Sequence, residues 1–283
     1  MDNNSLDQKK ETEAPEEDMV NTRTVYSKNQ AQKVMSLSIY VGQLLLSYGA
    51  EIYRTQDTMT RICEAYDNLY DIDVFGLTNG ILLSLEYDHE IITMFKNSTT
   101  SSLNLEKIDL INSFSRQFVL NPMNINEAMD RLKEIEEKDE NNPWTQIIFA
   151  GIASSFFALL FGADLKDFIS TFFVGALSYE LVALVSKLEL TFFIENFIGA
   201  FSSSLLAMVC VQAGLGSNID HIIIGSIMLF VPGVAITNAV RDVMSGDFIS
   251  GLVGFTKAIF IALAIAIGVG LVLNYYYQGG LNL

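Results

Sequence analysis

The uneven distribution of charge constrains this chain more than any other feature of its sequence. Residues 144–283 hold only four of the 17 lysines and arginines and eight of the 33 aspartates and glutamates. A water-soluble domain this poor in charge would expose large apolar patches. This half contains five apolar segments that approach the ~20 residues a helix needs to cross a ~30 Å hydrocarbon core; they cover about 145–162, 168–186, 192–214, 220–239 and 251–273. Since the connections are short, the sequence predicts a bundle of five transmembrane helices.

The charged half has the patterns of a soluble α+β domain. Helical spacing of apolar residues runs from Lys33 to Tyr66 and predicts one long helix. Alternating apolar and polar residues then predict three short strands, followed by two helices that Pro122 separates. The expected strands are Asp73–Leu77, Gly80–Tyr87 and Glu90–Phe95, and the expected helices are Leu103–Leu120 and Asn124–Lys138.

These patterns predict four regions in the chain. We expect a disordered acidic tail over residues 1–27, a cytoplasmic α+β domain over 28–143, a five-helix transmembrane domain over 144–276 and a short tail over 277–283. The formal net charge of −16 argues against binding to nucleic acid or to an anionic lipid surface. The two cysteines lie in different halves and predict no disulfide framework.

Basic residues near the ends of the apolar segments predict an orientation. With the charged domain inside the cell, Lys187 and Arg241 lie on the cytoplasmic side and only Lys166 lies outside, as the excess of positive charge on cytoplasmic loops requires. The sequence therefore predicts a multi-pass protein of the plasma membrane with a cytoplasmic N-terminal domain.

The fourth apolar segment contains residues that a simple membrane anchor has no use for. Pro232 and Gly233 predict a broken helix, a device by which transporters free backbone groups to bind substrate. Asn238, Arg241 and Asp242 follow at helical spacing on one face, where they would bind a zwitterion or a carboxylate-bearing metabolite. The alternative is that Arg241 and Asp242 end the helix at the inner interface while Asn238 forms an interhelical hydrogen bond. Both interpretations stay open at this stage.

Two acidic residues lie inside other apolar segments. A carboxylate at the bilayer centre costs about 2.5–3.5 kcal/mol, so it normally faces a cavity or a partner. We expect Glu180 to line a pathway, whereas Glu195 either lines it or extends to the interface. Asp247 and Ser250 are expected to cap the start of the last span.

A polar face of the N-terminal half is formed by Glu51, Arg54, Thr58 and Arg61, with Asp57 at its edge. Its role is open between a solvated surface and a gate that docks on the membrane domain. His89 is expected to be a surface residue of a turn. The sequence has no P-loop, no nucleophile elbow and no cluster of metal ligands, so we expect no catalytic residues, no cofactor and no metal.

Two motifs resemble those of the threonine/serine exporter family. The first is LSYGAEIYR at residues 46–54 with Asp57, Thr58 and Arg61; the second is PGVAITNAVRD at residues 232–242, followed by Gly246, Asp247, Ser250 and Gly251. The second motif adds Thr237 to the predicted pathway. The chain departs from the pattern at Gly254 and Lys257, where relatives usually have an arginine and then an acidic residue.

The resemblance implies the larger subunit of a split exporter. Such a subunit would act in an oligomer with a small membrane partner of the same family, and it would move threonine- or serine-like amino acids or dicarboxylates such as succinate. The alternative from the residues alone is a membrane-anchored enzyme or sensor whose soluble domain carries the activity.

Overall fold

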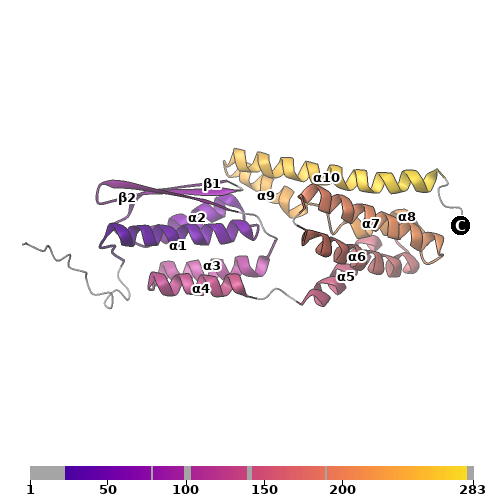
Figure 1. The fold of residues 1–283 in the computed structure, drawn as a ribbon, viewed down its shortest axis with the longest axis horizontal. Coiled ribbons are helices and arrows are strands. Elements are labelled where there is room, and N and C mark those ends of the chain that lie inside the picture. Colours follow the sequence, from indigo (N-terminus) through magenta and orange to yellow (C-terminus); the bar gives the residue numbers. More distant parts are fainter. Residues whose placement is uncertain (1–22, 78, 99–102, 139–141, 189, 279–283) are drawn as a thin grey trace, which may run out of the picture. The chain divides into compact units, whose positions relative to one another are not determined.

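The chain divides into two compact units, Met1–Lys138 and Asp139–Leu283. The structure, a computed structural model, describes residues 23–77, 79–98, 103–138, 142–188 and 190–278 (Figure 1). The sequence predictions for the remaining residues, including most of the acidic tail and the last five residues, lie outside the described ranges.

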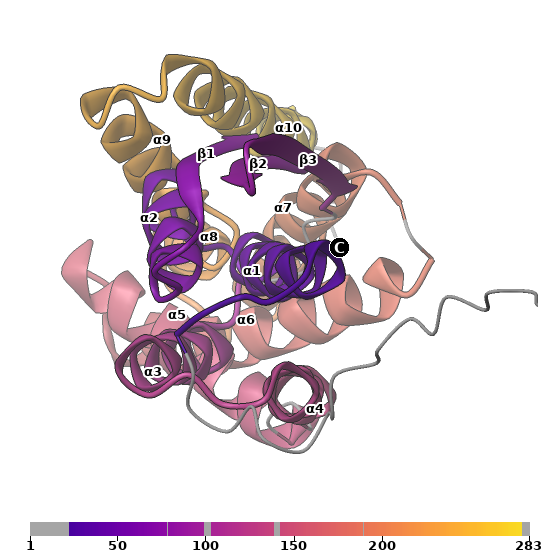
Figure 2. The same cartoon turned by 90° about the vertical axis from the view of Figure 1, so that its left-hand side faces the viewer.

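In the N-terminal unit, a three-stranded sheet and four helices form three layers. In chain order the elements are α1 (Lys28–Ser47), α2 (Ile52–Glu64), β1 (Tyr70–Leu77), β2 (Gly80–Tyr87), β3 (Glu90–Asn97), α3 (Leu105–Leu120) and α4 (Ile125–Glu137). Helix α1 packs between the sheet and the α3–α4 pair (Figure 2). This central position explains why α1 buries residues on all its faces, since only a buried helix is apolar all round.

The sheet is antiparallel with the order β1-β2-β3. On the central strand Ile81, Leu83 and Leu85 are all fully buried, as the alternation in the sequence predicts. Asp88 and His89 form the turn between β2 and β3 with φ values of 52° and 60°, which suits the twist of a two-residue hairpin loop. The side chain of His89 is 97% exposed, and its Nδ1 lies 3.5 Å from a carboxylate oxygen of Glu86.

The single helix predicted over Lys33–Tyr66 is wrong, because the chain turns at Gly49. The amide of Gly49 donates to the Leu46 carbonyl (3.1 Å), and the amide of Ala50 donates to the Leu45 carbonyl (3.0 Å). With φ +86° at Gly49, this is a Schellman C-cap. The apolar spacing continues in α2, which is why periodicity alone hid the break between α1 and α2.

We predict that Gly49→Ala destabilises the N-terminal unit by about 1–2 kcal/mol, since a residue with a Cβ resists the left-handed region. A Cβ at this position would also lie 3.0 Å from Leu103 Cδ1. Gly49→Asn is the matched control, because asparagine tolerates positive φ better while adding the same Cβ. Thermal unfolding of the two purified variants compares the effects, and equal losses of stability would contradict a role for the backbone conformation.

The disorder expected through residue 27 does not extend over residues 23–27. Val25 is 2% exposed; its amide donates to Asn68 Oδ1 (2.9 Å) and its carbonyl accepts from Asn68 Nδ2 (2.7 Å). Ser27 caps α1 by accepting from the Gln30 amide (3.2 Å). The buried side chain of Val25 and the cap formed by Ser27 therefore order this segment. The acidic composition of the preceding residues concealed both signals.

The second unit is entirely helical within its described residues. It contains α5 (Pro143–Leu160), α6 (Leu165–Ser186), α7 (Phe192–Gln212), α8 (Ile219–Ile227), α9 (Gly233–Met244) and α10 (Phe248–Tyr277). Four of these helices, α5, α6, α7 and α10, are long and apolar enough to cross a membrane. The segment predicted over 220–239 does not form one spanning helix: the break that Pro232 and Gly233 predict separates α8 from α9, each too short to cross alone.

Large apolar side chains lie on the outside of this unit and small ones lie inside. Phe156, Phe173 and Leu263 are among the exposed large side chains, whereas the buried positions of α5, α6 and α7 are mostly glycine, alanine, serine and threonine. Lipid offers no hydrophobic drive for helices to associate, so small residues that allow close approach hold such bundles together. Lys166 lies in the first turn of α6 and Lys187 is its C-cap residue.

Candidate transport site

An inverse γ-turn separates α8 from α9. Pro232 has φ −79° and ψ 53°, and the Gly233 amide donates to the Val231 carbonyl (2.8 Å). Pro232 offers no amide of its own, so the α8 helix cannot continue through it. Within the described residues no side chain caps α9, and no hydrogen bond reaches the amides of Val234 and Ala235. The positive end of α9 is thus open to an anionic group.

Helices α9 and α10 form a tight hairpin on small residues. A Cβ on Gly251 would lie 2.3 Å from Val243 Cγ2 and 2.7 Å from the Ala239 carbonyl oxygen, and one on Gly254 would lie 3.1 Å from Ala239 Cβ. The link between the helices turns at Gly246, whose φ is +98°. The end of the same hairpin forms an apolar groove of about 430 Å³, which is lined by residues such as Val240, Phe248 and Phe255.

We predict that Gly251→Ala destabilises the membrane unit by about 1–3 kcal/mol, since the added methyl group meets a backbone oxygen that cannot move aside. Gly270→Ala is the matched control on the same helix, because within the described residues the added Cβ has no atom within 4 Å apart from the neighbouring backbone of its own helix. Thermal unfolding in detergent measures both variants. If the Gly251→Ala variant has the same unfolding temperature as the native protein, the close approach of Gly251 to Ala239 is not needed for the hairpin.

The polar residues of α9 do not share one face. Asp242 is 5% exposed and Asn238 is half-buried, whereas Arg241 is exposed. Neighbouring residues of a helix lie about 100° apart, so Arg241 and Asp242 face different surroundings despite their closeness in sequence. The hydroxyl of Thr237 donates to the Gly233 and Val234 carbonyls at 3.1 and 2.9 Å and is satisfied within its own helix.

The remaining membrane residues singled out in the sequence occupy three settings. Glu180 on α6 and Glu195 on α7 are half-buried, and neither side chain forms a hydrogen bond or an ion pair within the described residues. Asp247 is the N-cap residue of α10, but its side chain makes no capping hydrogen bond. Ser250 lies inside the first turn of α10 and is 4% exposed.

The charged face of the first motif is held by contacts within α2 and its cap. Arg61 Nε lies 2.8 Å from Asp57 Oδ2, and Arg54 Nε lies 3.6 Å from Glu51 Oε2 and 2.9 Å from the Tyr53 hydroxyl. The Tyr53 hydrogen bond, followed by the charge of Glu51, raises the pKa of Arg54. The side chains of Arg54, Asp57 and Arg61 are more than half exposed, while Thr58 is half-buried.

Sequence reasoning missed a buried carboxylate that ties α6 to α8. Asp167, in the first turn of α6, is 1% exposed. Its Oδ1 accepts from the amides of Ser217 (2.6 Å) and Asn218 (3.0 Å), and its Oδ2 lies 3.2 Å from His221 Nδ1. Asp164 caps α6 and accepts from the Ser217 hydroxyl (2.6 Å); the Asp167 amide and this hydroxyl lower its pKa. The spacing of Asp164 and Asp167 is typical of a helix cap. The amides and the histidine that contact Asp167 are distant in the sequence, so no local pattern predicts them.

We predict that Asp167→Ala destabilises the membrane unit by about 3 kcal/mol, because two amides and a histidine lose their buried acceptor. Asp220→Ala is the matched control: Asp220 lies in the first turn of α8 but is exposed, so its loss costs only a few tenths of a kcal/mol. Thermal unfolding in detergent ranks the two, and equal transition temperatures would show that the buried carboxylate is not a structural tie.

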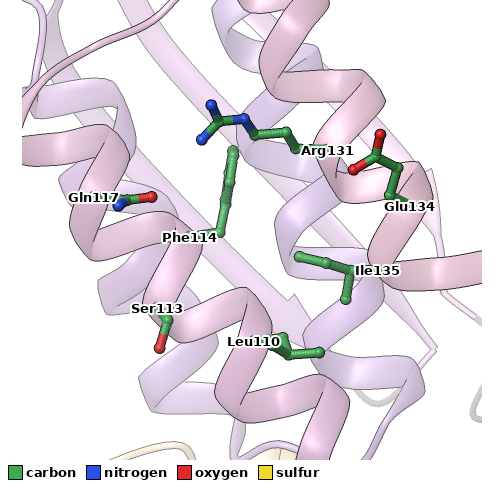
Figure 3. Close-up of a pocket in the computed structure, with 7 residues that line it drawn as sticks. All are labelled: Leu110, Ser113, Phe114, Gln117, Arg131, Glu134 and Ile135. Carbon is green, nitrogen blue, oxygen red and sulfur yellow. The ribbon is translucent and has the colours of Figure 1, made fainter. Parts of the chain in front are cut away.

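The N-terminal unit has a cleft of about 350 Å³ between α3 and α4. Figure 3 shows Phe114 and Gln117 of α3 facing Arg131 and Glu134 of α4 across it. Arg131 is ion-paired with Glu127 at 2.9 Å. The described residues contain no group of three or more potential metal ligands. The cleft is therefore lined by an ion-paired arginine and an aromatic ring. Its lining residues do not pair a nucleophile with a general base, as a catalytic site requires.

A family model described as a putative threonine/serine exporter matches residues 36–276. The chain belongs to the threonine/serine exporter family. The match includes both units, from the middle of α1 almost to the end of α10. Membership and the four apolar helices make it a multi-pass membrane protein.

Three curated relatives carry transporter names. The probable succinate transporter subunits YjjP of Escherichia coli K12 and Klebsiella aerogenes are each 22% identical; the alignments cover 87% and 86% of this chain and 96% and 93% of the relatives. The probable threonine/serine exporter of Mycobacterium tuberculosis is 20% identical over 89% of this chain but only 48% of its own length. No solved structure matches the chain. These names indicate a transporter subunit rather than an enzyme.

Proposed function

We propose that this chain is the larger subunit of a secondary exporter that moves small polar metabolites across the plasma membrane. The observation that carries the proposal is the helix break at Pro232, which opens the positive end of α9 within a unit whose other long helices are apolar enough to span the bilayer. Transporters use such half-helices to bind anionic substrate groups. Succinate, threonine and serine all carry a carboxylate that suits this helix end.

The polar side chains near the break have separate roles in this proposal. Asn238 and Asp242 lie on the packed side of α9 and would orient the substrate, while Arg241 on the exposed side would attract its carboxylate. Glu180 and Glu195 would line the pathway as half-buried carboxylates. In the N-terminal unit, which we place in the cytoplasm, the face of Glu51, Arg54, Asp57, Thr58 and Arg61 would act as a gate.

A small membrane partner completes the proposed exporter. The E. coli and K. aerogenes relatives are named as transporter subunits, which supports a split transporter with a separate partner. A small membrane protein of the same family would be that partner, so the working exporter would be an oligomer of the two. The substrate is a dicarboxylate such as succinate or a threonine- or serine-like amino acid.

The test is counterflow in proteoliposomes that contain this chain and its partner. Labelled succinate, serine and threonine are offered in turn, and at least one is expected to accumulate against its unlabelled form. Arg241→Ala should reduce that flux by about tenfold or more, the effect of losing one charged hydrogen bond. Lys187→Gln removes a cation at the end of α6 instead and should leave flux unchanged.

Two results would contradict different parts of the proposal. Absence of counterflow for all three compounds by the native complex would remove the transport function. A fully active Arg241→Ala complex, inserted at the native level, would remove Arg241 from the pathway and leave the transport function standing.

A further inference from the structure

Seven of the nine buried serines of the membrane unit fall into two groups. The first group satisfies its hydroxyls with backbone carbonyls: Ser155 donates to Gly151, Ser202 to Gly199, Ser204 to Ala200 and Ser226 to Ile222, all at 2.8–3.0 Å. This is the ordinary arrangement of a serine inside a helix that has no water to bond. The second group is Ser154, Ser178 and Ser203, which are 0% exposed and make no hydrogen bond within the described residues.

The serines of the second group also lie inside helices, yet their hydroxyls form no hydrogen bond to a backbone carbonyl. A buried hydroxyl without a partner is unfavourable, and alanine would fill the same space without that penalty. Ser154 shows the direction most clearly, because its Oγ lies 2.1 Å from the place where a Cβ on Gly175 would stand. The Ser154 hydroxyl on α5 therefore points at the surface of α6.

Ser178 and Ser203 lie at the same level on facing helices. Two contacts show that α6 and α7 run antiparallel: Val182 Cγ2 lies 3.0 Å from the Cβ position of Gly199, and the Ser170 hydroxyl donates to the Leu215 carbonyl (2.9 Å) just beyond α7. The first contact gives the register near Ser178. Moving one turn from Val182 towards Ser170 leads to Ser178. Moving one turn from Gly199 in the same direction leads to Ser203. Ser178 is also one turn from Gly175, where Ser154 packs.

We propose that Ser178 and Ser203, with Ser154 one turn away, form a hydrogen-bonding site for the oxygen atoms of the transported metabolite. The inference rests on the proposed transport function and adds the place where a substrate is held between α6 and α7. Each hydroxyl donates to a carboxylate oxygen, the group that small dicarboxylates and hydroxy amino acids share. The present structure shows the site closed, and separation of α6 and α7 admits the ligand.

The first test replaces both hydroxyls in the native complex. Ser178→Ala/Ser203→Ala removes two donors that have no partner in the closed state, so the thermal transition without substrate stays at or above the native temperature. Counterflow of the preferred substrate falls by about tenfold for each hydroxyl. The stabilisation that saturating substrate gives the native complex is lost, since ligand binding stabilises only a protein that binds it.

Ser204→Ala is the matched control for this pair. Ser204 is equally buried on the same helix, but its hydroxyl is already bonded to the Ala200 carbonyl. Its replacement leaves flux and the substrate-induced thermal shift at native values. If Ser178→Ala/Ser203→Ala keeps the native shift and flux, or lowers stability without substrate while the shift remains, the serines hold at most a structural water and the proposal is overturned.

A second test measures access to the site by cysteine labelling. The chain has two cysteines; burial raises the pKa of the Cys63 thiol to about 12 and keeps it unreactive, so only the half-buried Cys210 needs replacement by alanine. Ser178→Cys in that background reacts with methyl methanethiosulfonate during transport, and saturating substrate slows the reaction by about tenfold. Ser204→Cys, the control, does not react.

The outcomes separate this inference from the transport proposal. If the native complex shows counterflow but substrate does not protect Ser178→Cys, the serine site is wrong and the transport function stands. If the native complex shows no counterflow of succinate, serine or threonine, both fail. Protection together with loss of flux in Ser178→Ala/Ser203→Ala supports the site.

Discussion

The close approach of backbones at small residues is the contact on which the membrane unit depends. A Cβ on Gly151 would lie 2.8 Å from the Phe172 carbonyl oxygen, one on Gly225 would lie 2.8 Å from that of Ser154, and one on Gly268 would lie 2.9 Å from that of Phe197. These three glycines join α5 to α6, α8 to α5, and α10 to α7. Dispersion contacts over such short distances replace the hydrophobic drive that lipid cannot supply.

The same packing attaches the two halves of the broken helix to different supports. Helix α8 packs on α5, α6 and α7, and the Asp167 carboxylate ties its start to α6, whereas α9 packs on α10 through Ala239 and Gly251. The turn at Pro232 therefore joins two helices that pack on different parts of the bundle. A change in the distance between α10 and the other helices would alter the geometry of this turn more than that of either helix, which suits a binding element that must open and close.

The sequence predicted the parts of this fold whose signals are local. Alternation placed the three strands, Pro122 separated α3 from α4, and hydropathy located every long apolar helix. It missed Gly49 because apolar spacing continues from α1 into α2. Pro232 predicted the break before α9, but hydropathy did not show that α8 already ends at Ile227. Asp167 and His221 are 54 residues apart, so no local pattern links them. The spacing of Arg241 and Asp242 likewise concealed their difference in burial.

At the interfaces of α6 with its neighbours, close packing favours contact between the helices, whereas buried hydroxyls without hydrogen bonds favour their separation. At Gly175 and Gly199 the α6 helix lies so near its neighbours that no ligand fits, yet Ser154, Ser178 and Ser203 remain without hydrogen bonds there. Separating these helices loses dispersion contacts that lipid or a ligand partly restores, and it exposes hydroxyls that gain partners. In the proposed transport cycle, packing would stabilise the closed state and hydrogen bonding to a ligand would stabilise the open one. Two opposing terms of this kind would suit the two-state interface that alternating access requires.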